Sequence, residues 1–287
     1  MLGSRPDCFY HSSAIDAIAF YDHHPISERQ VLDAVARRRG GELRGLTADD
    51  LFEFDQDHYG GLAAVDTLAR HAGVTATSRV LDVCAGLGGP ARFLASRRGC
   101  RVVGIELNPG RAAGARRLTE RVGLGRRVRI VRGDAGRLPF GSHAFDACLS
   151  QEALLHIDDK GAVLRECYHV LVPGGRIAFT DWIAHPPLAE GERRRLTEWM
   201  AATTVQSLQS YQELLGRAGF HAIAAEDVSD EWRPLLRRRL QMYRALRADT
   251  VARVGEALYA QYDQLYTFFV GLVEDGKLGG GRFSGTA

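Results

Sequence analysis

Short apolar runs alternate with longer amphipathic segments over most of the chain. From Arg79 onward, the apolar runs predict buried strands, and the segments with apolar positions three and four apart predict helices between them. Because helical crossovers join parallel strands, we expect an α/β fold with a mostly parallel sheet and helices on both of its faces. The predicted strands span residues 80–83, 101–106, 128–132, 144–149, 176–181 and 221–228, and the predicted helices span 90–98, 111–122, 160–171, 188–205 and 210–218.

The segments on either side of this core are helical in pattern. Helices are predicted at 26–39, 47–54 and 62–72, so residues 1–75 are expected to form an N-terminal helical cap. The expected core spans residues 76–229, with a helical insertion at about 186–206. Residues 230–276 have apolar positions at helical spacing and predict a helical lid, and residues 277–287 predict the final strand of the sheet.

The composition narrows the classes of function. Of the 287 residues, 45% are hydrophobic and 25% are charged, which is typical of a globular protein, and the formal net charge of +2 argues against a nucleic-acid partner. The five cysteines are scattered without CxxC spacing, which favours a reducing compartment over a disulfide framework or a zinc site. No apolar run suits a membrane span or a secretion signal, so we expect a cytoplasmic protein without a membrane partner. The oligomeric state is left open.

Polar side chains stand at the ends of four predicted strands. Asp82 ends the first strand before a glycine-rich turn, Glu106 ends the second, and Asp134 follows the third. Residues 150–152, with the sequence Ser-Gln-Glu, follow the fourth. Since ligands of parallel sheets bind at the carboxyl ends of the strands, we expect these side chains to converge on one ligand site.

The turn after Asp82 narrows the identity of this ligand. A dinucleotide fingerprint would have glycine at position 84, where this chain has Cys84, and the Lys-Ser or Lys-Thr pair of a P-loop is missing. Asp82 would also repel a pyrophosphate. Glu106 suits the two hydroxyls of a ribose, and Asp134 could accept a hydrogen bond from an adenine amino group. The residues therefore favour a nucleoside without phosphates.

This layout resembles the class I S-adenosylmethionine-dependent methyltransferases. The resemblance implies a Rossmann-like, seven-stranded sheet and S-adenosyl-L-methionine as the cofactor. It places Asp82 near the methionine part, Glu106 on the ribose, and Asp134 with Ala135 on the adenine. The matching motifs are residues 82–88, 106, 133–135, 138–140 and 172–175, and residues 277–283 resemble the last antiparallel strand of the family. The further cofactor contacts that it implies are Tyr59, Cys84, Gly86, Gly88, Leu107 and Gln151.

A closer resemblance is to the phosphoethanolamine and sarcosine/dimethylglycine N-methyltransferases, which act on small molecules. It rests on residues 58–61 (HYGG), 87–95 (LGGPARFLA) and 150–160 (SQEALLHIDDK). In that group an acidic residue and a histidine four positions later lie beside the transferred methyl group, which implies Glu152 and His156 here. The phosphobase enzymes also close an N-terminal tyrosine over that histidine and hold a substrate phosphate with basic residues. No clear counterpart of either is identified, and residues 198–211 contain no Lys or Arg, which argues against a phosphorylated substrate.

Glu152 and His156 are the expected catalytic residues. At four positions apart they would share one face of a helix, if this segment is helical. An amine nucleophile must arrive neutral and a hydroxyl must lose its proton, and histidine is the side chain best suited to act as a base near neutral pH. A metal site formed by this pair with Asp158 and Asp159 is disfavoured, because no further set of carboxylates is recognised, and we expect no metal.

The expected function is S-adenosylmethionine-dependent methylation of a small molecule, at an amine nitrogen, with His156 as base or as a hydrogen-bond partner of the substrate. Three alternatives stay open. The methyl group could go to oxygen or carbon of an apolar metabolite. The protein could instead be an NAD-dependent oxidoreductase, which Cys84 and Asp82 disfavour, or a binding module without catalysis.

Overall fold

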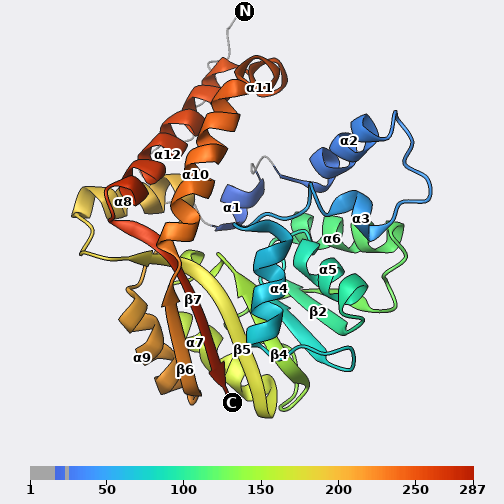
Figure 1. The fold of residues 1–287 in the computed structure, drawn as a ribbon, viewed down its shortest axis with the longest axis vertical. Coiled ribbons are helices and arrows are strands. Elements are labelled where there is room, and N and C mark those ends of the chain that lie inside the picture. The colour runs from blue at the N-terminus through green and yellow to red at the C-terminus, as the bar shows by residue number, and fades with distance from the viewer. Residues whose placement is uncertain (1–16, 23–25) are drawn as a thin grey trace, which may run out of the picture.

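A seven-stranded sheet forms the centre of the protein in the computed structural model, which describes residues 17–22 and 26–287. The strand order is β3-β2-β1-β4-β5-β7-β6, and only β7 runs antiparallel to its neighbours (Figure 1). This confirms the predicted α/β class and the Rossmann-like sheet. The strands are β1 (Arg79–Val83), β2 (Arg101–Glu106), β3 (Val128–Arg132), β4 (Phe145–Gln151), β5 (Leu171–Ala184), β6 (His221–Asp227) and β7 (Leu278–Thr286).

Helices cover both faces of this sheet. Successive side chains of a strand point to opposite faces, so Val80 packs in the apolar layer under α4, α5 and α6, and Leu81 packs in the layer under α7 and α9. The described helices are α1 (Ala17–Asp22), α2 (Glu28–Arg38), α3 (Ala48–Leu51), α4 (Gly61–His71), α5 (Gly89–Arg97), α6 (Pro109–Arg121), the 3-10 turn η1 (Leu154–His156), α7 (Lys160–Val170), α8 (Glu190–Met200), α9 (Leu208–Ala218), α10 (Ser229–Ala245), α11 (Arg247–Val254) and α12 (Glu256–Glu274).

The C-terminal helices α10, α11 and α12 extend beyond one end of the sheet (Figure 1). Helix α10 packs directly on β7, because Gly280 has no side chain: a Cβ there would lie 2.4 Å from the ring of Trp232. Trp232 packs edge-on against Trp182 of β5, which in turn contacts Phe269 of α12. The helical segment is thereby joined to the sheet through an aromatic cluster.

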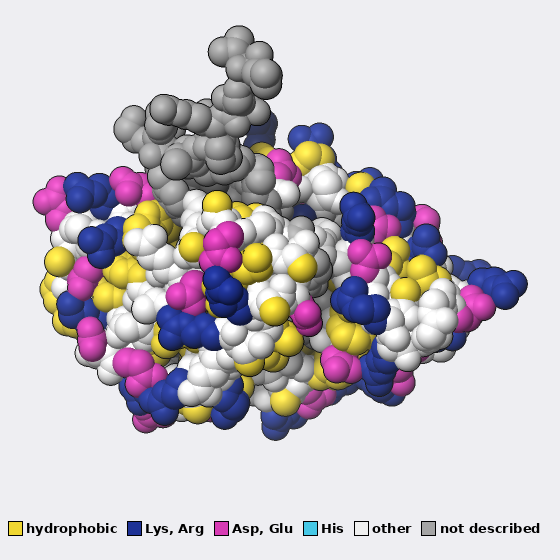
Figure 2. Space-filling view, turned by 90° about the horizontal axis from the view of Figure 1, so that it is seen from above, with side chains coloured by type: hydrophobic (Ala, Val, Ile, Leu, Met, Phe, Trp, Pro, Cys, Tyr) yellow, Lys and Arg dark blue, Asp and Glu magenta, His cyan; other side chains and the backbone are white. Residues whose placement is uncertain are grey.

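Charged side chains of both signs lie interspersed over the face seen in Figure 2. Several of the arginines of α10 and α11 are paired with acidic residues of α12. The pairs are Arg237–Glu274, Arg244–Asp263 and Arg247–Glu256. Within the described ranges, none of the helices combines the length and apolar character that crossing a membrane requires.

The structure corrects the bounds of three predicted elements. The helix expected over 188–205 ends at Met200, since Ala201 has a left-handed backbone (φ 51°). The strand expected over 176–181 extends over Leu171–Ala184, because pairing with β7 continues to its end. The helical segment 230–276 is broken at Leu246 and at Gly255, where φ is 85°.

The division of the chain at residues 75, 229 and 276 stays a prediction. Residues 1–16 and 23–25 of the expected N-terminal cap lie outside the described residues.

Candidate active site

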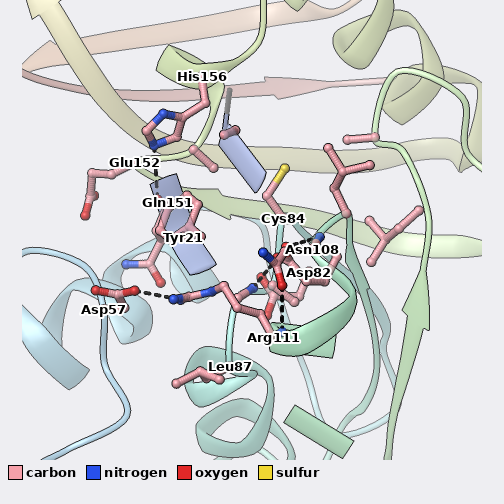
Figure 3. Close-up of a pocket in the computed structure, with 18 of the residues that line it drawn as sticks. Tyr21, Asp57, Asp82, Cys84, Leu87, Asn108, Arg111, Gln151, Glu152 and His156 are labelled. Atoms are coloured by element: carbon pink, nitrogen blue, oxygen red, sulfur yellow. Dashed lines mark hydrogen bonds and ion pairs between the residues drawn. The ribbon is translucent and has the colours of Figure 1, made fainter. Parts of the chain in front are cut away.

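A pocket lies at the carboxyl ends of the central strands, where the strand order reverses between β1 and β4 (Figure 3). Sheets of this class bind their ligands at this point. Helix α1 contributes Ala17, Ile18 and Tyr21 to the wall of the pocket. The sequence-predicted residues that line it are Asp82, Cys84, Gly86, Glu106, Leu107, Asp134, Ala135, Gln151, Glu152 and His156.

The glycine turn after β1 is tied to the end of β2 by Glu106. One carboxylate oxygen of Glu106 accepts a hydrogen bond from the backbone N–H of Gly86 at 2.8 Å, and the other accepts from the N–H of Asn108 at 2.8 Å. Gly86 has φ 55°, a conformation that favours glycine. These bonds hold the Glu106 carboxylate in one orientation at the pocket wall, as a ribose contact would require.

Two buried polar atoms at the pocket have no hydrogen-bond partner among the described residues: Oδ2 of Asp82 and Nε2 of Gln151. One is an acceptor and the other a donor, so together they are complementary to the ammonium and carboxylate groups of an amino acid. Burial, and then the charge of Glu106, raise the pKa of Asp82 to about 7. A cation beside it would favour its charged form.

The position of Cys84 departs from the glycine expected there, and its backbone still adopts the left-handed conformation, with φ 60°. Residues other than glycine adopt this left-handed backbone conformation at an energetic cost. Burial raises the pKa of the thiol above its ordinary value, so the side chain is a neutral part of the pocket wall.

Two predicted cofactor contacts lie outside the pocket lining. Gly88 precedes α5 with φ 76°, and a Cβ there would lie 3.0 Å from Arg92, so this glycine serves the turn and the close approach of a buried arginine. The ring of Tyr59 packs against Trp182 and Trp232. Its backbone N–H nevertheless reaches the site, because it donates to Glu152 at 2.7 Å.

The segment of Glu152 and His156 is not a continuous helix, so the two residues do not share the helical face that a helix would have given them. Glu152 has φ 45°, and only the single 3-10 turn η1 follows it, so the two side chains leave the chain in different directions (Figure 3). The Glu152 carboxyl accepts hydrogen bonds from the Tyr59 N–H and from the Thr180 hydroxyl, the latter at 2.6 Å. Burial raises its pKa to about 8, although both hydrogen bonds oppose the shift.

His156 is oriented by contacts on both of its ring nitrogens. Nδ1 lies 3.0 Å from the carbonyl oxygen of Ala201, and Nε2 lies 3.0 Å from the hydroxyl of Tyr21. A carbonyl only accepts hydrogen bonds, so Nδ1 carries a proton. In the neutral ring Nε2 then accepts the hydrogen bond that Tyr21 donates, which makes Nε2 the basic nitrogen.

Tyr21 is a site residue that the sequence pattern does not predict. It lies in the N-terminal segment, where the resemblance to the phosphobase enzymes implies a tyrosine that closes over the histidine and where the sequence offers no clear counterpart. The six-residue helix α1 gives little periodicity by which to recognise it. Tyr10 and Tyr21 both lie in that segment, so the sequence alone could not choose between them; Tyr10 lies outside the described residues.

Comparison with known proteins shows the family. A family profile described as "Methyltransferase domain" matches residues 81–179. The chain is 31% identical over 197 residues to 27-O-demethylrifamycin SV methyltransferase from Amycolatopsis mediterranei, and the match covers 68% of this chain and 72% of that relative. It is 32% identical over 171 residues to the glycine/sarcosine/dimethylglycine N-methyltransferase from Actinopolyspora halophila, covering 58% of this chain and 30% of that protein. The chain spans less than two thirds of the length of several curated relatives.

The fold has close counterparts among solved structures. Phosphoethanolamine N-methyltransferase 2 from Haemonchus contortus, in complex with phosphomonomethylethanolamine and S-adenosylhomocysteine, matches with a TM-score of 0.76 and 19% identity. The match covers 95% of this chain and 60% of that chain.

The residues of the pocket fit the family's cofactor. Asp82 and Gln151 would hold its amino-acid part, Glu106 its ribose, and Asp134 with Ala135 its adenine. The profile match, the identity across most of a curated methyltransferase and the sheet topology agree. The chain belongs to the class I S-adenosylmethionine-dependent methyltransferases, and S-adenosyl-L-methionine is its cofactor.

Proposed function

We propose that the protein methylates the nitrogen of a small amine, with Glu152 holding the amine and His156 accepting its proton. The observation that supports this most is the Glu152 carboxyl. It lines the pocket, lies buried, and forms no ion pair within residues 17–22 and 26–287. A buried carboxyl without a cationic partner is costly in its charged form, and a protonated amine would supply that partner.

The partners of Glu152 prepare it for this role. The Tyr59 N–H and the Thr180 hydroxyl each donate to one of its oxygens, so the carboxyl keeps its orientation without a basic neighbour in ion-pair contact. With a pKa of about 8, the group is largely neutral at pH 7 in the ligand-free protein. An ammonium group alongside would lower this pKa and make the carboxylate the stable form.

His156 then takes up the proton that the amine must lose. Because Nδ1 donates to the carbonyl oxygen of Ala201, Nε2 is the nitrogen that acts as the base once the acceptor displaces the Tyr21 hydroxyl from it. S-adenosylmethionine supplies an electrophilic methyl group on a sulfonium. The aromatic rings of Phe20 and Tyr21 lie against the imidazole, with centroids 5.8 and 5.3 Å away, and help to keep water from it.

A hydroxyl acceptor is the second candidate. Nε2 of His156 could remove the proton of a hydroxyl in the same way, and the apolar side chains of Leu87, Leu107 and Ile157 in the lining would accommodate an apolar metabolite. One relative that the chain covers for most of its length carries a name that refers to 27-O-demethylrifamycin SV rather than to an amine.

The test is an acceptor panel with S-adenosylmethionine that carries a deuterated methyl group. Sarcosine, dimethylglycine, ethanolamine, phosphoethanolamine and a phenol without nitrogen are incubated separately, and mass spectrometry locates the label. We expect label on an amine nitrogen, and we expect Glu152→Gln to raise KM for that amine. Label on the phenol alone, with the amines untouched, would refute the proposal in favour of the second candidate.

A further inference from the structure

The proposed chemistry makes no use of Arg111, although this buried side chain meets several segments of the chain at the pocket. It extends from the first turn of α6, and its Nη2 donates to Asp57 at 2.6 Å (Figure 3). Nη1 donates to the carbonyl oxygen of Ile26 at 3.3 Å, and the guanidinium lies over the ring of Tyr21, 4.5 Å from its centroid.

The glycine turn after β1 leaves space for the guanidinium of Arg111. A Cβ on Gly86 would lie 2.8 Å from Nη2 of Arg111, so the absence of a side chain at this position allows the arginine to pass. The same glycine donates its N–H to Glu106. Arg111 therefore packs between the turn expected to hold the cofactor and the helix that carries Tyr21.

Helix α1 needs such an external support. It has six residues, none of them fully buried, and a helix this short is not stable through its own hydrogen bonds. The β2–α6 turn provides polar anchors instead. Nδ2 of Asn108 donates to the carbonyl oxygen of Ile18 at 3.2 Å and to the Asp22 carboxylate at 2.8 Å. Oδ1 of the same Asn108 accepts from the backbone N–H of Arg111 at 2.9 Å.

A planar guanidinium suits this position better than an ammonium would. It can stack on an aromatic face while its edge donates to a carboxylate, which is the combination that Arg111 makes with Tyr21 and Asp57. Asp57 keeps the buried charge paired, and the ring of Tyr21 is held with its hydroxyl toward Nε2 of His156.

We infer that Arg111 is a positioning residue for methyl transfer, which sets the place of Tyr21 against His156 through its stacking and through its ion pair with Asp57. The inference rests on the proposed role of His156. It assigns to α6 a function in the reaction besides that of covering the sheet, and it links the glycine turn to the orientation of the base.

A double-mutant cycle tests this inference. Arg111→Lys keeps the charge and loses the planar stacking, and the pair Arg111→Met with Asp57→Asn removes both charges, so that no lone charge is left buried. With the fastest acceptor of the panel above, we expect each to lower kcat by up to about fivefold, the loss that corresponds to the hydrogen bond of the Tyr21 hydroxyl, because Arg111 acts through that contact. In a Tyr21→Phe background the same changes should have little further effect. Arg117→Ala, at a more exposed position of α6 where the arginine pairs with Glu28 of α2, serves as the matched control.

A second readout needs no activity. In the ligand-free protein, hydrogen exchange of the amides of residues 18–22 should quicken in the Arg111 variants and stay unchanged in Arg117→Ala. Unchanged exchange, or losses in kcat that multiply independently with Tyr21→Phe, would overturn the inference. Loss of S-adenosylmethionine affinity by calorimetry in Arg111→Lys, in step with kcat, would make Arg111 a cofactor ligand instead. If His156→Ala leaves kcat intact, the proposed function fails, whereas the exchange result still decides the role of Arg111.

Discussion

The hydroxyl of Tyr21 and Nε2 of His156 lie 3.0 Å apart, although 135 positions separate the two residues in the chain. The contact joins a short N-terminal helix to the 3-10 turn that follows β4. Together with the bond from Nδ1 to the Ala201 carbonyl, it leaves the imidazole with one basic nitrogen, directed toward the pocket.

Removal of the His156 imidazole should slow the reaction without weakening cofactor binding. We expect His156→Ala to lower kcat by about 10²–10⁴, the usual contribution of a general base. Tyr21→Phe should lower it by about fivefold, which corresponds to one hydrogen bond. Steady-state kinetics and calorimetry with S-adenosylmethionine check both effects. Unchanged turnover in His156→Ala would exclude this side chain as the base.

Cofactor affinity should depend on pH through Asp82. Its pKa is about 7, and only the ionised carboxylate attracts an ammonium group, so affinity should rise between pH 6 and 8, by at most about tenfold per unit. Asp82→Asn should bind more weakly and lose this part of the pH dependence. Calorimetric titration with S-adenosylmethionine at pH 6, 7 and 8 measures it. A variant that retains the wild-type slope would show that another group causes it.

The stability of the ligand-free protein should fall as pH rises, because of Glu152. Its pKa is about 8 in the folded protein, against an ordinary value of 4.5, so between these pH values the folded state holds a proton that the unfolded chain has released. The favourable contribution of Glu152 to the free energy of unfolding is complete below about pH 4.5, and it is lost as pH rises through 8. A single carboxyl that is protonated in the folded protein and ionised in the unfolded chain changes the free energy of unfolding by up to about 1.4 kcal/mol per pH unit.

Urea unfolding between pH 5 and pH 8 measures this dependence. Glu152→Gln should flatten it, whereas Glu213→Gln, at an exposed pair with Arg217 on α9, should leave it as it is. Equal slopes in the wild type and in Glu152→Gln would contradict the assignment.

Gly280 should not tolerate a side chain. A Cβ would lie 2.4 Å from the Trp232 ring, so Gly280→Ala must displace α10 from β7, at a cost of about 1–3 kcal/mol in the free energy of unfolding. Gly271→Ala is the control, since that position lies inside α12 with nothing within 4 Å, and alanine should stabilise the helix by about 0.5–1 kcal/mol. Thermal and urea unfolding compare the two. Similar effects at both positions would speak against close packing at β7.

The backbone of Cys84 should prefer glycine. At φ 60° a residue with a side chain costs about 1–2 kcal/mol, so Cys84→Gly should raise the free energy of unfolding by up to about 1 kcal/mol after the entropy of glycine is subtracted. Cys84→Val should lower it, because branching at Cβ worsens the strain. If Cys84→Gly is less stable than the wild type in urea unfolding, the packing of the thiol outweighs the backbone strain.

The sequence alone was sufficient to predict the α/β fold, the strand ends that meet at the pocket and a nucleoside ligand without phosphates, and the resemblance to the methyltransferases implied the cofactor. The reason is that these features are local. Asp82 and Glu106 each end an apolar run, and in a parallel sheet all such ends meet at one edge, so their convergence follows from the pattern. The glycine turn likewise depends on neighbouring residues only.

The contacts around the methyl acceptor were decided by tertiary structure. Glu152 and His156 would share a helical face only in a helical segment, and the left-handed backbone at Glu152 turns its side chain instead toward Thr180 and Tyr59. Tyr21 reaches His156 because α1 is held by side chains of α6, from a part of the chain that follows it by many positions. Such contacts have no periodicity within one segment. They form where separately folded elements pack together, and this is why only the three-dimensional structure brings Tyr21 and Arg111 into the site.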